Sequence, residues 1–157
     1  MLRNLLTVAA VAAVFASAGG AAAARSRHAD VEVRDAWSRP AAAGTTGAGF
    51  ATLENHGRRA DALLRVESPL VRAVEIHQTR MEGGVMSMSR IERLPVPAGG
   101  SVTLAPGGAH LMLIDLSKAI GPGDRIPAIL TFASGARLSV QFEVRTTPPA
   151  GGAHHQP

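Results

Sequence analysis

Short runs of apolar or alternating apolar and polar residues recur along most of the chain, separated by Gly, Pro, Asn and Asp. This spacing is typical of an all-β domain, and no helical periodicity of useful length interrupts it. Eight or nine strands at this spacing favour a Greek-key β-sandwich or barrel. A single turn of helix fits only at Leu116–Ile120. The predicted strands are Val31–Trp37, Ala48–Leu53, Ala62–Ser68, Ala73–Gln78, Val85–Ile91, Ser101–Leu104, His110–Leu116, Ile126–Phe132 and Arg137–Val144.

The first 24 residues have the order of charges and apolar residues found in a secretory signal peptide. One positive charge, Arg3, precedes an apolar run from Leu5 to Ala16, which is too short to cross a bilayer. Small residues follow as far as Ala24, where we expect cleavage, and Ala16–Ala18 is a second candidate. A permanent membrane anchor is the alternative. The pattern predicts a periplasmic protein with a signal peptide at 1–24, a domain at 25–145 and a flexible tail at 146–157.

Composition removes several classes of function. The chain contains no cysteine, which excludes disulfides, thiolate metal centres, cysteine nucleophiles and a lipid-bearing cysteine. A net charge of only +4 and an aromatic content of 3% argue against a nucleic-acid surface. No stretch after the signal is long and apolar enough to span a membrane. We therefore expect one domain with a hydrophobic core and no stable membrane insertion.

All four methionines after the initiator lie within 32 residues of the chain, close to two histidines. Methionine as core filler would be expected anywhere in the domain, so this clustering indicates a site. A single His or Met taken alone is more often structural than a ligand. The six residues are His77, Met81, Met86, Met88, His110 and Met112.

The segment from His77 to Met88 predicts a β-hairpin with Gly83-Gly84 as its two-residue turn. Such a turn places Met81 opposite Met86 and Thr79 opposite Met88. Because side chains alternate between faces, these four residues share one face with His77. His110 and Met112 likewise share a face, with Leu111 on the other side. A one-residue slip would reverse these faces, so the register is an expectation.

The residue types favour Cu(I) as the metal. Thioether sulfur is a soft, neutral ligand that suits Cu(I), and imidazole suits several metals. Zinc normally takes Cys, His or carboxylate, and calcium and magnesium require clusters of oxygen ligands. Local geometry leaves all four methionines as candidate ligands beside the two histidines.

The spacing of His77, Met88, His110 and Met112 resembles the H-x10-M-x21-H-x-M motif of the periplasmic PCu(A)C copper chaperones. The resemblance covers about residues 31 to 145. Further segments that carry it are Asp35–Pro40, Glu75–His77, Gly84–Met88, Pro97–Gly100 and Pro106–Leu113.

This resemblance implies a cupredoxin-like β-sandwich that holds one Cu(I) ion through His77, Met88, His110 and Met112. Met81 and Met86 do not fall on the family's ligand positions. Family members often have Glu-Met after the first His, whereas here Gln78-Thr79 follows, so an auxiliary Met contact is lost. In some members a His- and Met-rich tail takes Cu(II). Here only His154 and His155 remain for a weak Cu(II) site, and a solvated tail is the favoured interpretation.

The same resemblance implies a metallochaperone that delivers copper towards the CuA centre of cytochrome c oxidase, alongside a Sco-like protein. We expect a monomer, and no local motif suggests an enzyme. The alternative is a periplasmic copper buffer or resistance protein that uses the same site without an oxidase acceptor. An electron-carrier cupredoxin would need a Cys ligand, which the chain lacks. An adhesive immunoglobulin-like module would leave the His and Met clustering unexplained.

Overall fold

The computed structural model describes residues 30–150, which form strands and turns and no helix. The all-β prediction is therefore confirmed. None of these residues belongs to a helix that is long and apolar enough to cross a membrane. The predicted signal peptide at 1–24 and the tail histidines lie outside the described residues. The strands are β1 Val31–Ser38, β2 Gly47–Asn55, β3 Asp61–Glu67, β4 Val71–Glu82, β5 Val85–Ile91, β6 Leu94–Val96, β7 Ser101–Leu104, β8 Ala109–Leu116, β9 Arg125–Phe132 and β10 Arg137–Val144.

Three details differ from the sequence-based expectation. Strand β6 has no counterpart among the nine predicted strands, because it has only three residues and a central proline. The proline confines it to a sheet edge. Strand β4 is longer than predicted, because the hairpin that follows continues its ladder without a break. No turn of helix forms after β8. Instead Ile120 forms an isolated bridge with Ala41, which ties the loop between β1 and β2 to the body.

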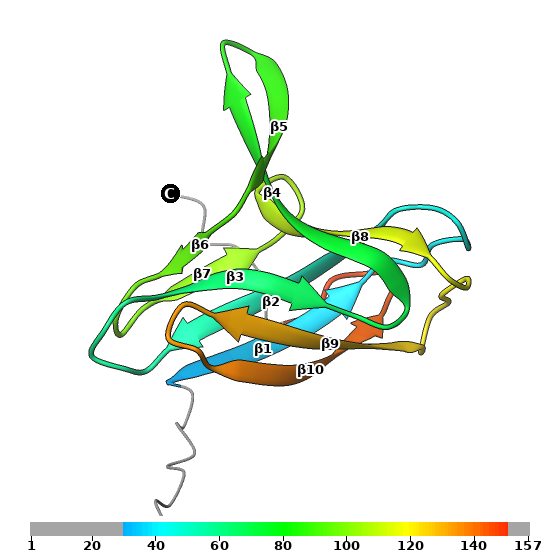
Figure 1. The fold of residues 1–157 in the computed structure, drawn as a ribbon. Helices are drawn as coiled ribbons and strands as arrows, with labels where there is room; N and C mark the ends of the chain where they lie inside the picture. Colours follow the sequence, from blue (N-terminus) through cyan, green and yellow to red (C-terminus); the bar gives the residue numbers. More distant parts are fainter. Residues whose placement is uncertain (1–29, 151–157) are drawn as a thin grey trace, which may run out of the picture.

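The strands form one continuous sheet in the order β5-β4-β8-β2-β1-β10-β9-β3-β6, with β7 paired to β2. The β1–β10 pair is parallel and all other pairs are antiparallel. The sheet curls over, so that β3, β9 and β10 cover β1, β2 and β8 (Figure 1). Consequently β5 and β6 lie at the two edges of the sheet.

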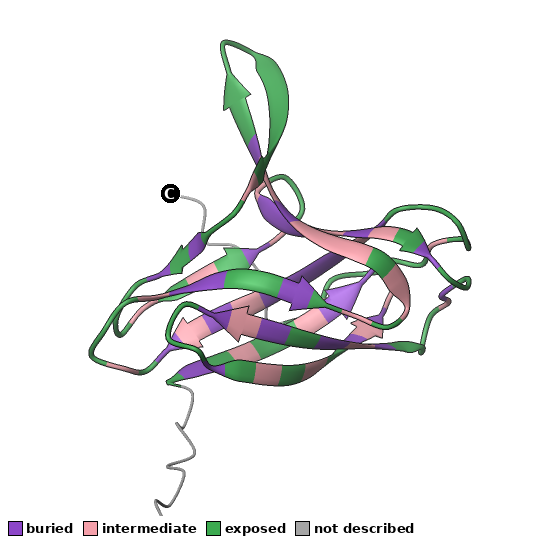
Figure 2. Ribbon diagram, viewed as in Figure 1, coloured by how far each residue is buried: buried purple, intermediate pink, exposed green. Residues whose placement is uncertain are grey.

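The core lies between these two parts of the curled sheet. Alternate residues point inward, which gives β9 the repeating pattern of buried Ile126, Ala128, Leu130 and Phe132. From the opposite part Leu53, Leu111 and Leu113 belong to the same core cluster. Figure 2 shows buried stretches on both parts of the curled sheet. Because Leu111 and Leu113 point inward, His110 and Met112 point outward.

The β4–β5 hairpin projects from the body and is exposed over most of its length (Figures 1 and 2). Its turn residues Gly83 and Gly84 have φ angles of 59° and 79°. Two positive φ angles define a type I′ turn, whose twist suits a two-residue hairpin and which glycine adopts without strain. Pairing of Met81 with Met86 and of Thr79 with Met88 confirms the predicted register.

Asp61, at the start of β3, fastens the β9–β10 turn to the body. Its carboxylate accepts hydrogen bonds from the Ser134 hydroxyl at 2.6 Å, the Ser134 amide at 3.0 Å and the Ala62 amide at 2.8 Å. Partial burial raises the pKa of Asp61, but these hydrogen bonds lower it by more. The net effect is a pKa below the usual value of 3.8.

We predict that Asp61→Ala lowers the free energy of unfolding by about 1 kcal/mol at neutral pH, because the turn loses a charged acceptor. The Asp61 contribution is fully present above pH 3.8 and is lost as pH falls through the lower folded-state pKa. Urea unfolding at several pH values measures both effects. Asp61→Asn keeps an acceptor and should remove this pH dependence while retaining part of the stability. Equal acid sensitivity in all three proteins would contradict the assignment.

Candidate metal centre

Two histidines lie side by side on the outer face of the sheet. His77 on β4 pairs directly with His110 on β8, and their ring centroids are 6.1 Å apart. Their chain neighbours Ile76 and Leu111 pair with each other and are 4% and 0% exposed, facing the core. The alternation of side chains therefore puts both imidazoles on the outer face of the sheet, away from the core side. The sequence placed each histidine on a face, and the β4–β8 pairing brings the two together.

The hydrogen bonds of the two rings define which nitrogen can bind a metal. His110 Nδ1 donates to the Gly108 carbonyl at 3.1 Å, which leaves the lone pair on Nε2 in the neutral ring. His77 Nε2 lies 2.9 Å from Glu75 Oε2 and donates to it, which leaves the lone pair on Nδ1. His77 Nδ1 is buried and has no hydrogen-bond partner. A buried acceptor of this kind is costly unless it has a ligand, so the donor set fits a metal ion.

The methionines of the predicted set flank His77 on opposite sides. Met88 on β5 lies opposite Thr79, and Met112 on β8 lies opposite Glu75. Each is thus a diagonal neighbour of His77, at a typical Cα separation of about 7–8 Å. Met88 is 54% exposed, whereas Met112 is partly buried between β4 and β2. All four predicted ligands share one face, and the long thioether side chains must reach inward to meet the imidazoles.

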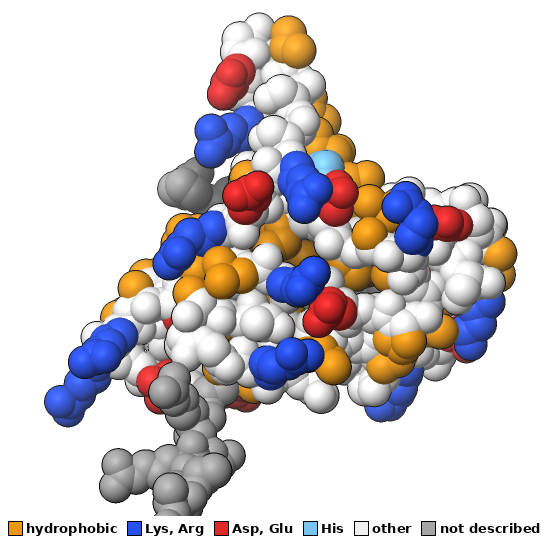
Figure 3. All heavy atoms as spheres, viewed as in Figure 1, with side chains coloured by type: hydrophobic (Ala, Val, Ile, Leu, Met, Phe, Trp, Pro, Cys, Tyr) orange, Lys and Arg blue, Asp and Glu red, His pale blue; other side chains and the backbone are white. Residues whose placement is uncertain are grey.

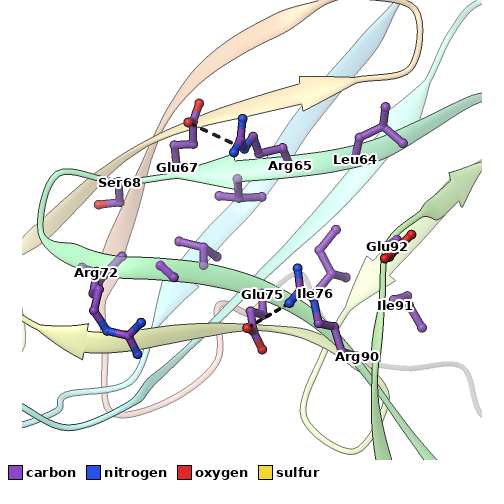
Figure 4. A pocket seen from close by; sticks show the side chains of 14 residues that line it. Leu64, Arg65, Glu67, Ser68, Arg72, Glu75, Ile76, Arg90, Ile91 and Glu92 are labelled. Carbon is purple, nitrogen blue, oxygen red and sulfur yellow. Dashed lines mark hydrogen bonds and ion pairs between the residues drawn. The ribbon is translucent and has the colours of Figure 1, made fainter.

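Glu75 links the histidines to a neighbouring arginine. While one carboxylate oxygen accepts from His77, the other accepts from Arg90 at 3.3 Å, as Figure 4 shows from the groove side. The hydrogen bond from His77 lowers the pKa of Glu75 most. Burial opposes it with the second-largest effect, and the charges of Arg90 and Arg72 lower the pKa further, so that the net shift is downward. Glu75 therefore stays ionised and holds the His77 ring in one tautomer. Sequence analysis assigned Glu75 no role, although its two-residue spacing from His77 places both on one face.

A groove with a cavity volume of about 690 Å³ lies between β3 and β4, beside Glu75. Its rim carries charges of both signs, and its floor includes Val74 and Ile76. Figure 4 shows Arg65 beside Glu67 on β3 and Arg90 beside Glu75 across the groove. The paired charges leave this groove without a strong preference for either sign.

The opposite end of the same outer face is aromatic. Ala48 on β2 pairs with Met112, and Phe50 follows two residues later on that face. Phe50 pairs with Trp37 on β1, with ring centroids 4.7 Å apart, and the two residues are 3% and 5% exposed. The outer face therefore changes from exposed thioethers on β5, through imidazoles, to buried aromatic rings. Figure 3 shows hydrophobic side chains running along the hairpin, with a histidine near its base.

A second group of metal-type ligands lies elsewhere on the described part of the chain. Side-chain atoms of Glu32, Glu54 and His56 lie within 4.8 Å of one another at the paired β1 and β2 strands. Arg34 forms ion pairs with both carboxylates at 3.2 and 3.1 Å, and His56 lies 3.1 Å from Glu32. The opposite charges of this group pair with one another at the surface, so the group is accounted for as an ion-pair network without a metal ion. The sequence analysis did not single it out, because its members are far apart in the chain.

Together, the fold and the outward residues define a class: a β-sandwich domain with histidines and methionines gathered on one sheet face. The chain belongs to the LpqE-like family, described as “Putative lipoprotein LpqE-like”, whose model matches residues 31–144. A relative in Leifsonia xyli subsp. xyli, “Putative lipoprotein Lxx21020”, is 30% identical over 73% of this chain and 69% of its own length. An uncharacterized Rickettsia prowazekii protein, RP573, is 27% identical over 64% of this chain and 56% of its own length.

Solved structures with this fold include PCuAC domains. The copper-bound PCuAC domain from PmoF2 is 25% identical, with a TM-score of 0.64 over 75% of this chain and 94% of that domain. The Cu(I) form of DR1885 from Deinococcus radiodurans is 26% identical, with a TM-score of 0.58 over 73% and 79%. These similarities confirm the predicted PCu(A)C-like fold, while the family itself is named for lipoproteins.

We predict that His77→Ala raises the pKa of Glu75 towards its usual value of 4.5, because the carboxylate loses its strongest hydrogen-bond donor. A carboxyl whose pKa is lowered on folding stabilises the protein above pH 4.5 and loses this contribution as pH falls through the folded-state pKa. The variant should therefore lose less stability on acidification. Carbon-detected NMR titration of the Glu carboxyls measures the pKa directly. His56→Ala is the control and should change Glu32 rather than Glu75.

Proposed function

We propose that this protein is an exported metallochaperone that binds one Cu(I) ion through His77, Met88, His110 and Met112. The observation that carries the proposal is the direct His77–His110 pair on a face that also holds every methionine after Met1. The similarity to the copper-bound PmoF2 domain and to Cu(I)-DR1885 supports the choice of metal.

The chemistry of the donors supports Cu(I) independently of these similarities. Two neutral imidazoles and two neutral thioethers form a soft set that suits a monovalent d10 ion better than zinc or calcium. Because thioethers do not titrate, acid should release the ion by protonating the histidines. Bound copper would supply no redox chemistry in this role. The chain's own contribution is to orient the rings, through Glu75 at His77 and the Gly108 carbonyl at His110.

An open site suits transfer of the ion to another protein. Met88 lies on the edge strand β5 and is 54% exposed, so an incoming ligand can displace it first. The more enclosed histidines would then release the ion in later steps. We propose that the protein is a monomeric chaperone that delivers copper towards the CuA centre of cytochrome c oxidase. Its acceptor would be the CuA subunit or a Sco-like protein.

The family supports export, and the cysteine count supports release without a lipid anchor. Relatives in the family are described as lipoproteins, which are exported proteins. This chain has no cysteine to carry a lipid. We therefore propose that it is released into the periplasm by cleavage of the segment 1–24.

We predict that His77→Ala and Met88→Ala each weaken Cu(I) binding, because each removes one of four ligands. Competition with a Cu(I)-specific chromophoric chelator under anaerobic conditions measures the change. The histidine variant should lose more affinity, since His77 is held in its binding tautomer by Glu75. His56→Ala is the matched control, an exposed histidine in the Glu32–Glu54 network. Unchanged affinity in both site variants would overturn the proposed ligand set.

We predict that a strain lacking this protein loses oxidase activity at low copper, because delivery matters most when the ion is scarce. Oxidase activity in membranes, measured with and without added copper, checks this expectation. Complementation with the His77→Ala variant should fail, whereas His56→Ala should restore activity. Copper sensitivity without an oxidase defect would instead support a buffering or resistance role at the same site.

A further inference from the structure

The tip of the β4–β5 hairpin exposes sulfur to solvent. Met81 and Met86 are 65% and 64% exposed, and Met88 follows at 54%. A contiguous patch of exposed, large apolar side chains commonly marks a site that binds a ligand or another molecule. Two of these three methionines lie outside the proposed ligand set, so the site at the histidines leaves them unexplained.

The register brings the three thioethers within reach of one another. Glu82 and Val85 flank the two-residue type I′ turn and exchange the turn's hydrogen bonds. Since hydrogen-bonded and non-hydrogen-bonded pairs alternate, Met81 and Met86 form a non-hydrogen-bonded pair, whose Cα atoms lie only about 4.5 Å apart. Met88 is the next outward residue along β5 and is a diagonal neighbour of Met81.

The two faces of the hairpin differ in chemistry. The face opposite the methionines carries Gln78, Arg80, Glu82, Val85, Ser87 and Ser89. The methionine face carries no charged side chain between Thr79 and the turn; its nearest charge is Arg90, two residues from Met88, which forms an ion pair with Glu75. An apolar docking strip would be built equally well from Val, Ile or Leu, which also suit strands better. All four methionines after Met1 lie on this one face, which indicates that their sulfur atoms, and not only their apolar surface, have a role there.

We propose that Met81, Met86 and Met88 form a second, solvent-open Cu(I) site, from which the ion passes to the histidines. This inference rests on the proposed copper site. Met88 belongs to both sets and stays bound while the thioethers of Met81 and Met86 are exchanged for the imidazole nitrogens of His77 and His110. Only metal–ligand bonds break and form, every ligand is neutral, and copper remains Cu(I) throughout.

Burial along this route supports its direction. The exposed fraction falls from 65% at Met81 and 54% at Met88 to 15% for the His77 side chain and 9% for His110. An ion that enters at the hairpin tip therefore loses its water gradually. The outer thioethers bind Cu(I) more weakly than the histidine site, because they supply no imidazole and remain exposed to water.

Anaerobic Cu(I) titration of protein labelled with ¹³C at the methionine methyl groups tests the proposal. The first equivalent should shift the methyl signals of Met88 and Met112. The second, held by Met81 and Met86 with the Met88 sulfur shared between the two ions, should shift the signals of Met81 and Met86. In the Met81→Leu/Met86→Leu variant, which keeps apolar area and volume, the second equivalent should be lost. Affinity for the first should be unchanged, and transfer of Cu(I) to a chelator should be slower than in the natural protein.

Leu64→Met provides the control, because Leu64 is 42% exposed and stands apart from the hairpin methionines on β3. Its lone thioether should not respond at the second equivalent. If Met81 and Met86 stay unshifted when the second equivalent is added, or if the Leu variant transfers copper at the natural rate, the second site is wrong. If Met81 and Met86 shift but the His77 and His110 ring signals do not, the second site stands and the proposed function fails.

Discussion

The ladder between β4 and β8 is the constraint on which the rest of the site depends. It pairs His77 with His110, and on its other side it buries Ile76 against Leu111. A slip of one residue would turn an imidazole into the core and a leucine into solvent, which the core packing opposes. Core burial therefore holds the register, and the register holds the two imidazoles 6.1 Å apart between ring centroids. The arrangement of the proposed ligands is thus stabilised by hydrophobic residues on the other side of the sheet.

The charged residues that flank the proposed ligands are Glu75 and Arg90, and Arg72 is close enough to Glu75 to lower its pKa. The proposed ligands are neutral, so a bound Cu(I) ion would bring an uncompensated positive charge onto the sheet face. Glu75 is ionised and bonded to His77, and it also accepts from Arg90, which balances the carboxylate when no ion is present. Metal ligands are commonly oriented by such an outer carboxylate. The arrangement fixes the His77 ring while leaving the thioethers free to move.

Side chains on the outer face become more buried from the sheet edge at β5 towards β2 and β1. The hairpin depends for its shape on a glycine turn and one ladder, so it projects from the body with few contacts beyond β4 and β5 (Figure 1). The histidines lie one strand further in, and Phe50 and Trp37 close the face at β2 and β1. In the proposed function, a soft ion would enter and exchange ligands most easily at the exposed hairpin. It would be held most strongly at the histidines, where water is largely excluded. One sheet face would thus serve both uptake and retention of the ion.

The sequence alone determined the all-β class, the hairpin register and the face shared by His77, Met81, Met86 and Met88, because these follow from side-chain alternation and a two-residue glycine turn. The residue types predicted Cu(I) as the metal, and the family spacing predicted which four of the six candidates are ligands. Only the tertiary structure decided that β4 pairs with β8, since residues 77 and 110 are distant in the chain. It also placed Arg90 on Glu75 and added the short strand β6. Such contacts depend on which strands become neighbours when the sheet curls, and local patterning does not encode that choice.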